Sequence, residues 1–106
     1  RRWRLIKMAL SDKFEVGETV VCSITIKTTS TSALTDPTSI VIQIADSYGA
    51  VWVSTVAMTN DGTGVDHYDF QTVGVAPGKC TVRYTATDGA GLGARITIHD
   101  DYLTLV

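Results

Sequence analysis

Apolar and polar residues alternate along the first half of the chain. Over residues 19–28 every second position from Val20 to Ile26 is apolar, and residues 40–44 follow the same pattern. Because successive side chains of a strand point to opposite faces, this period of two predicts strands with one face buried and the other in water. The stretch 28–38 between them is rich in Thr and Ser, which is typical of a loop.

The second half of the chain repeats the pattern. Strands are predicted over residues 51–58, 66–70 and 80–86, and a final strand pair starts within residues 94–98. Two consecutive aspartates at positions 100–101 predict a break or bulge before the last few residues.

Turn signals rich in Gly, Pro, Asp and Asn separate these runs, and no helix of useful length can be placed. Seven or eight short strands in one chain predict an all-β fold, an antiparallel β-sandwich. The alternation also predicts the core, which we expect to consist of Val20, Cys22, Ile24, Ile26, Ile40, Ile42, Ile44, Tyr68, Phe70, Val82, Tyr84 and Ile98.

Composition agrees with this pattern. Val, Ile and Thr make up 36 of the 106 residues, and β-branched residues favour strands over helices. The chain is 44% hydrophobic and 19% charged, which are values of a folded domain, and its length suits one domain. No apolar run is long enough for a membrane-spanning helix and no secretory signal is visible, so no membrane partner is expected.

The N-terminus differs in charge from the rest of the chain. Residues 1–7 hold four of the nine basic residues, whereas residues 8–106 carry a net charge of −6. We therefore predict a basic arm or leader over residues 1–13 and a sandwich domain over residues 14–106. Two interpretations stay open, because Met8 also resembles a natural start that would make the preceding residues a leader.

A native arm would be mobile in an isolated monomer and would bind a neighbouring subunit in an assembly. Nucleic acid is not expected to bind the acidic body, because phosphate contacts dominate such affinity, and only the arm could make them. The predicted partner-binding arm consists of Arg1, Arg2, Trp3, Arg4, Leu5, Ile6 and Lys7.

Four segments resemble the small immunoglobulin-like domains of bacterial and archaeal surface proteins, which also occur in tailed-virus structural proteins. They read VGETVVCSITIK, DPTSIVIQIADSYGAVWV, MTNDGTGVDHYDF and APGKCTVRYTATDG, and the resemblance spans residues 14–106. It implies an immunoglobulin-like sandwich and a spacer, adhesive or virion role, without choosing among them. Asp66 departs from the pattern, because the group usually has an inward aromatic residue there. Either this strand enters the core later than usual or Asp66 lies at a solvated edge.

In this topology Cys22 and Cys80 fall on inward positions of two strands on opposite sheets. Their similar height makes a disulfide possible. The alternative is a pair of buried thiols, which is usual in a reducing compartment.

Catalytic and cofactor sites are not expected. The two histidines, His67 and His99, lack metal-ligand spacing, although nearby aspartates could join them if folding brought these residues together. Aspartates in four turns, at positions 36, 46, 61 and 88, could bind Ca²⁺ between them, but none forms a dedicated calcium loop. The glycines at positions 89, 91 and 93 precede no helix that could bind phosphate. We therefore predict a protein that is not an enzyme.

The expected function is structural. We expect a non-enzymatic protein of an assembled particle, namely a capsid decoration or a neck or tail accessory of a tailed-virus virion. It would contact protein subunits of the same assembly, as a homo-oligomer or bound to a larger particle. The alternative is an immunoglobulin-like module of a secreted or cell-surface adhesin, whose exposed aromatic residues Tyr48, Trp52 and Tyr102 could bind a glycan.

Overall fold

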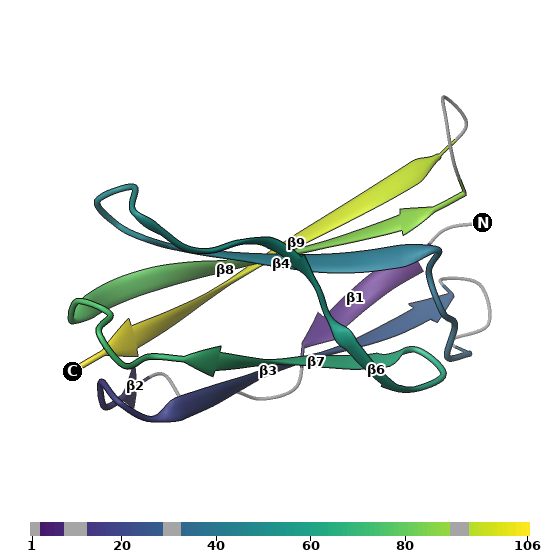
Figure 1. Ribbon diagram of the computed structural model, residues 1–106. Coiled ribbons are helices and arrows are strands. Elements are labelled where there is room, and N and C mark those ends of the chain that lie inside the picture. The colour runs from purple at the N-terminus through teal and green to yellow at the C-terminus, as the bar shows by residue number, and fades with distance from the viewer. Residues whose placement is uncertain (1–2, 8–12, 29–32, 90–93) are drawn as a thin grey trace.

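The computed structural model describes residues 3–7, 13–28, 33–89 and 94–106, which form two β-sheets packed face to face (Figure 1). These residues contain nine strands and no helix, so none of them forms a helix able to cross a membrane. The strands are β1 (Trp3–Lys7), β2 (Lys13–Phe14), β3 (Thr19–Thr28), β4 (Ser39–Asp46), β5 (Val51–Ala57), β6 (Thr59–Gly62), β7 (Val65–Gln71), β8 (Gly78–Asp88) and β9 (Arg95–Leu105).

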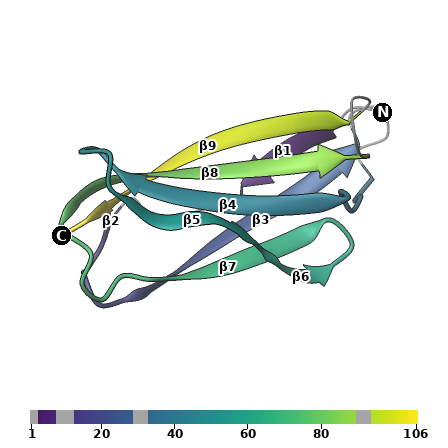
Figure 2. The same cartoon turned by 45° about the horizontal axis from the view of Figure 1, so that its top comes forward.

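One sheet has the strand order β1-β3-β7-β6 and the other β2-β9-β8-β4-β5 (Figure 2). All pairings between these strands are antiparallel except that of β2 with β9. This arrangement matches an immunoglobulin-like sandwich, in which the first, second, fifth and fourth main strands share one sheet and the third, sixth and seventh share the other. The predicted fold class is confirmed, and the predicted body, residues 14–106, holds the seven strands β3–β9.

The core lies between the two sheets and follows the predicted alternation. The even-numbered positions of β3, from Val20 to Ile26, are fully buried, and so are Ile42 and Ile44 of β4. On β7, Phe70 is buried and Tyr68 packs against the core as a half-buried residue. Leu103 and Leu105 of β9 complete the core at the end where the chain finishes.

Ile98 is the one wrong prediction in the core list, because its side chain is 56% exposed. The expected break at Asp100 and Asp101 does not occur: β9 runs without a register shift from Arg95 to Leu105. Since Leu103 faces the core, every even-numbered residue of this continuous strand faces outward, and Ile98 is one of them.

The first residues also differ from expectation. The segment expected to be mobile in a monomer contains β1, which pairs with β3 in the register Trp3↔Thr28 to Lys7↔Ile24. A short segment cannot nucleate structure alone, but the edge of β3 already presents a fixed row of hydrogen-bonding groups. A partner-binding role of this segment stays a prediction, and Arg1 and Arg2 lie outside the described residues.

Candidate functional site

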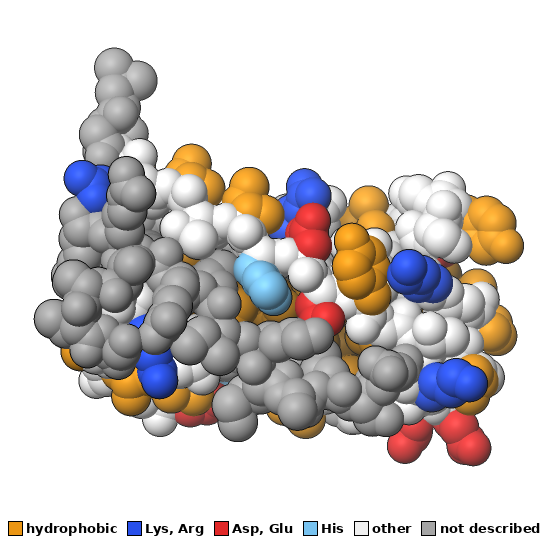
Figure 3. Space-filling model, turned by 180° about the vertical axis from the view of Figure 1, so that it is seen from behind, with side chains coloured by type: hydrophobic (Ala, Val, Ile, Leu, Met, Phe, Trp, Pro, Cys, Tyr) orange, Lys and Arg blue, Asp and Glu red, His pale blue; other side chains and the backbone are white. Residues whose placement is uncertain are grey.

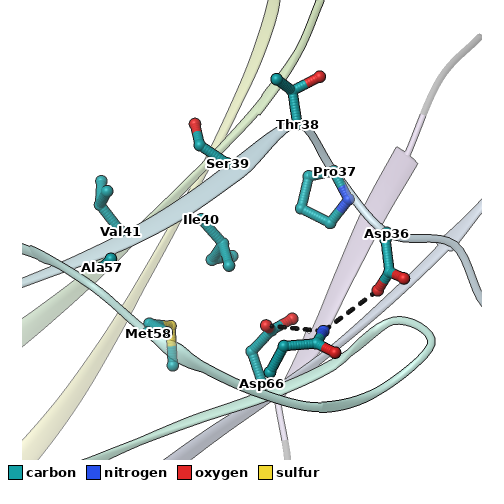
Figure 4. A pocket seen from close by; sticks show the side chains of 10 residues that line it. Asp36, Pro37, Thr38, Ser39, Ile40, Val41, Ala57, Met58 and Asp66 are labelled. Carbon is teal, nitrogen blue, oxygen red and sulfur yellow. Dashed lines mark hydrogen bonds between the residues drawn. The ribbon is translucent and has the colours of Figure 1, made fainter.

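A pocket of about 370 Å³ opens at one end of the sandwich. It lies between the start of β4 and the β6–β7 hairpin, so it is formed by both sheets (Figure 4). One side is apolar and the other carries two carboxylates and an amide. Its lining residues are Asp36, Pro37, Thr38, Ser39, Ile40, Val41, Ala57, Met58, Asn60 and Asp66.

The polar side of the pocket is organised by Asn60. Asn60 of β6 and Asp66 of β7 are direct partners in the antiparallel ladder, so their side chains lie side by side. The Asn60 amide Nδ2 donates toward the Oδ1 atoms of Asp36 and Asp66, each 3.2 Å away (Figure 4). It also donates toward the Gly62 carbonyl oxygen at 3.0 Å.

The turn between β6 and β7 fixes the third member of this group. The backbone N–H of Gly64 donates to Asp36 Oδ1 at 2.7 Å, and this bond ties the loop before β4 to the hairpin. Gly64 has φ +72°, and a Cβ there would lie 2.6 Å from the Ile26 carbonyl oxygen. Only glycine allows both this backbone conformation and this close approach.

Asp66 is the unusual residue of the pocket. It lies on the inward face of β7 and is only 2% exposed. Its Oδ2 atom has no hydrogen-bond partner, whereas Oδ1 accepts the bond from Asn60. Burial raises the pKa of Asp66 above its usual range, the bond from Asn60 lowers it, and the nearby Asp36 and Asp61 carboxylates raise it further. A buried carboxylate of which one oxygen lacks a hydrogen-bond partner destabilises the fold.

Both expectations for Asp66 are answered by this geometry. The strand does not enter the core late, since Asp66 shares its inward face with Tyr68 and Phe70. It does not lie at a solvated edge either, because it is only 2% exposed; it lies where the core ends and the pocket begins.

The outer face of the five-stranded sheet is a second candidate surface, and the strand registers place its residues in rows. Ile98 lies beside Thr85, which lies beside Val41, which lies beside Ala57. A second row, one step closer to the C-terminus, has a salt bridge: Arg83 Nε and Nη2 donate to the two carboxylate oxygens of Asp100 at 2.8 and 3.0 Å.

The same face carries further apolar residues at both of its ends. Ile96 and Tyr102 of β9 are 63% and 52% exposed, and Lys79 lies over the Tyr102 ring at 4.6 Å from its centre. Figure 3 shows hydrophobic side chains spaced along the molecule among basic and acidic ones. A shallow hollow of about 200 Å³ on this face is lined by Gln43, Ala45, Thr81 and Arg83.

The two histidine groups do not come together. His67 faces away from the core on β7, where its Nδ1 lies 2.6 Å from Asp61 Oδ2 and its Nε2 3.9 Å from Asp69 Oδ1. The bond to Asp61 raises the pKa of His67. His99 lies on β9 of the other sheet, facing inward beside the Tyr84 ring. Across the described ranges, no three His, Cys, Asp or Glu side chains form a group able to hold a metal ion.

The other aspartates next to these histidines have separate surroundings. Asp100 is held by Arg83, which lowers the pKa of its carboxyl, and Asp101 is 5% exposed on the inward face. Of the turn aspartates, Asp46 accepts bonds from the N–H groups of Tyr48 and Ala50 and from Trp52 Nε1, so it serves the β4–β5 turn. Gly89 precedes no helix, and the two following glycines of its loop lie outside the described residues.

The three aromatic residues considered for glycan binding lie on different strands. Tyr48 is 89% exposed in the turn after β4, and Trp52 follows it at the start of β5. Tyr102 is on β9, which β8 and β4 separate from β5. A single glycan site could therefore include Tyr48 and Trp52 but not Tyr102.

Both cysteines are buried free thiols in the structure. Cys22 lies on β3 and Cys80 on β8, so they are on opposite sheets as expected. Burial raises the pKa of Cys22 to about 12 and also raises that of Cys80, which makes both thiols poor nucleophiles.

Sequence reasoning missed the pocket as a unit. Asp36 and Asp66 were interpreted separately, as a turn residue and as an exception in a strand, and Asn60 was not singled out. The available signal was the aspartate on an inward position; its pairing with Asn60 is visible only in the structure.

Solved structures confirm the fold at low sequence identity. The endo-β-1,4-mannanase from Thermotoga petrophila matches with a TM-score of 0.68 and 13% identity, over 100% of this chain and 20% of that chain. A DUF4785 family protein from Legionella pneumophila matches with a TM-score of 0.71 and 8% identity, over 97% and 28%. CopC from Methylosinus trichosporium OB3b matches with a TM-score of 0.63 and 15% identity, over 96% and 93%.

These matches show a shared β-sandwich and nothing finer. The chain spans only a fifth of the mannanase and 28% of the Legionella protein, but nearly all of CopC. No family model and no curated protein matches the sequence.

Proposed function

We propose that this chain is a non-enzymatic structural protein of an assembled particle, and that it contacts neighbouring subunits through the outer face of its five-stranded sheet. The observation that carries the proposal is the set of large apolar residues on the outward side of β9. Ile96, Ile98 and Tyr102 are each more than half exposed on this one strand. Exposed apolar residues gathered on one surface are typical of a protein interface.

The outer face of the other sheet offers a contrast. Outward positions of β3 and β7 there include Ser23, Lys27, His67 and Asp69, and Val21 is the exposed large apolar residue of these two strands. A polar face of this kind is suited to remain in water, which supports the five-stranded sheet as the contact surface.

Two charges on the proposed contact face are already paired within the chain. Arg83 and Asp100 form a two-pronged hydrogen-bonded pair between the apolar rows. A partner can cover such a pair without leaving a single charge buried and unpaired, which would be strongly destabilising. The face therefore combines apolar contact area with a fixed polar feature that can set the orientation of a partner.

The setting that we propose is a tailed-virus virion, with the chain acting as a capsid decoration or as a neck or tail accessory. The sequence resemblance to immunoglobulin-like domains of such particles supports it. The partners would be protein subunits, in a homo-oligomer or in a larger particle, with residues 1–7 as an additional contact.

A second candidate is a module of a secreted or cell-surface adhesin. It is favoured by the matches in which this fold makes up only a fifth to about 28% of a longer protein. One of these proteins is named for action on a polysaccharide, so this candidate includes glycan binding through Tyr48 and Trp52. An open reading frame with similar domains on either side would favour this candidate over the virion protein.

Paired variants test the contact face. Ile98→Lys places a charge on the proposed face, and Val21→Lys places the same charge at a comparably exposed apolar position on the other sheet. Mass spectrometry of purified particles should detect the wild-type protein and Val21→Lys at similar levels, and Ile98→Lys at a much lower level. Absence of the wild-type protein from the particles would overturn the proposed setting. Equal incorporation of both variants would overturn the proposed face.

A further inference from the structure

Three oxygen atoms surround the amide nitrogen of Asn60. Asp36 Oδ1, Asp66 Oδ1 and the Gly62 carbonyl oxygen all lie 3.0–3.2 Å from it. The Gly64 N–H also donates to Asp36 Oδ1, so this N–H and the two amide hydrogens of Asn60 serve the three oxygens. Two of the three oxygens belong to carboxylates, so a positive charge at the point where they converge would be stabilising.

Asp66 is the residue of this group that lacks a full set of hydrogen-bond partners. It is 2% exposed, it lines the pocket, and its Oδ2 atom has no partner. The hydrogen bond from Asn60 reaches its other oxygen, Oδ1. A carboxylate that is buried in this way is stabilised by a bound cation.

We infer that this end of the sandwich binds a calcium ion through the carboxylates of Asp36 and Asp66, the Gly62 carbonyl and the side-chain oxygen of Asn60. A half-turn of the Asn60 amide places its oxygen where its nitrogen now lies, which gives a cluster of four oxygens. In a calcium site the ligands lie at about 2.3–2.6 Å from the ion, so neighbouring oxygens are roughly 3 Å apart. After this turn the Asn60 oxygen would lie 3.0–3.2 Å from each of the other three oxygens, which agrees with this spacing, and the pocket leaves room for water to complete the shell.

The donor set selects calcium among common cations. All four ligands are oxygens, and neither a thiol nor an imidazole belongs to the cluster, which disfavours zinc and copper. Magnesium requires shorter bonds and near-octahedral geometry, whereas calcium accepts the irregular arrangement of a loop, a bulge and a strand. Asp61 also lies near Asp66, but its carboxylate is bonded to His67 Nδ1, so it is not counted among the ligands.

Calcium binding to the chelator-treated full chain tests this inference. Titration calorimetry with CaCl₂ should show saturable binding, and the thermal unfolding midpoint should rise with calcium concentration, because a ligand of the native state stabilises it. Asp36→Asn and Asp66→Asn should each weaken binding by about tenfold or more. Asp69→Asn is the matched control, since Asp69 is an exposed aspartate of the same hairpin that points away from the pocket. It should bind like the wild type.

Asp36 is exposed, so its variant tests the site even if Asp66→Asn folds poorly, and circular dichroism checks folding in each case. Two results would overturn the inference: no binding heat and no thermal shift with the wild type, or unchanged affinity in folded Asp36→Asn. Magnesium should bind more weakly than calcium. An equal response to MgCl₂ would overturn the assignment to calcium, because it would show that the pocket attracts cations in general. Binding of methylammonium without binding of calcium would assign the pocket to an amine instead.

Discussion

The middle of the sandwich and the end near Asp66 are built from the same strands but from opposite chemistry. In the middle, Cys22 of β3 and Ile42 of β4 are fully buried in an apolar core. At the end, Ile40 and Met58 form one side of a pocket whose other side holds Asp36 and Asp66. The contrast indicates that the apolar middle stabilises the fold, whereas the buried carboxylate of the proposed calcium site destabilises it.

The largest effect is expected in the middle. Ile42→Ala should lower the free energy of unfolding by about 2–4 kcal/mol, because the substitution removes buried surface and leaves a cavity. Val41→Ala, at the next position but on the half-buried outer face, should have a clearly smaller effect. Urea unfolding of both variants measures the difference, and an unchanged midpoint for Ile42→Ala would contradict the assigned faces of β4.

A smaller effect is expected at the turn that supports the pocket. Gly64→Ala should lower the free energy of unfolding by about 1–3 kcal/mol, because it forces a left-handed conformation on alanine and pushes its Cβ into the Ile26 carbonyl. Gly62→Ala is the control, since a Cβ at Gly62 would point into open space and its φ is not positive. Similar stability of the two variants in thermal unfolding would show that the hairpin does not pack closely on the loop before β4.

The smallest effect concerns the cysteines. Burial raises the pKa of Cys22 to about 12 and also raises the pKa of Cys80. Both thiols should therefore resist a thiol reagent at mildly alkaline pH while the protein is folded. Two thiols should react after unfolding without reductant, and reductant should leave the melting temperature unchanged. The absence of reactive thiols in the unfolded, unreduced chain would instead establish the disulfide between Cys22 and Cys80.

Sequence alternation predicted the middle of the molecule well, because inward and outward positions of a strand differ in polarity wherever one face is buried. It failed for Ile98, because the nearby aspartates indicated a break in the strand. The strand β9 is continuous, so Leu103 on the inward face places Ile98 on the outward face. It also missed the pairing of β1 with β3, which depends on an available sheet edge rather than on any property of the segment itself.

The binding end could not be predicted in the same way. Asp36 reaches the hairpin through a loop whose path depends on tertiary structure, and the bond from the Gly64 N–H is visible only in the fold. Aspartate and asparagine are also the usual residues of turns, so each position had an adequate local explanation.

The central claim is that Asp66 destabilises the fold in the absence of a cation. The unfolding free energies of the wild type and Asp66→Asn, measured in chelator from about pH 4 to pH 8, test it most directly, since an unfolded aspartate titrates near pH 3.9. Burial raises the pKa of Asp66 in the folded state, so the folded protein binds more protons than the unfolded chain between the two pKa values. Wild-type stability relative to Asp66→Asn should therefore fall as the pH rises through this window and then level off. A relative stability that increases with pH would mean that the folded protein favours the carboxylate, and would contradict the account.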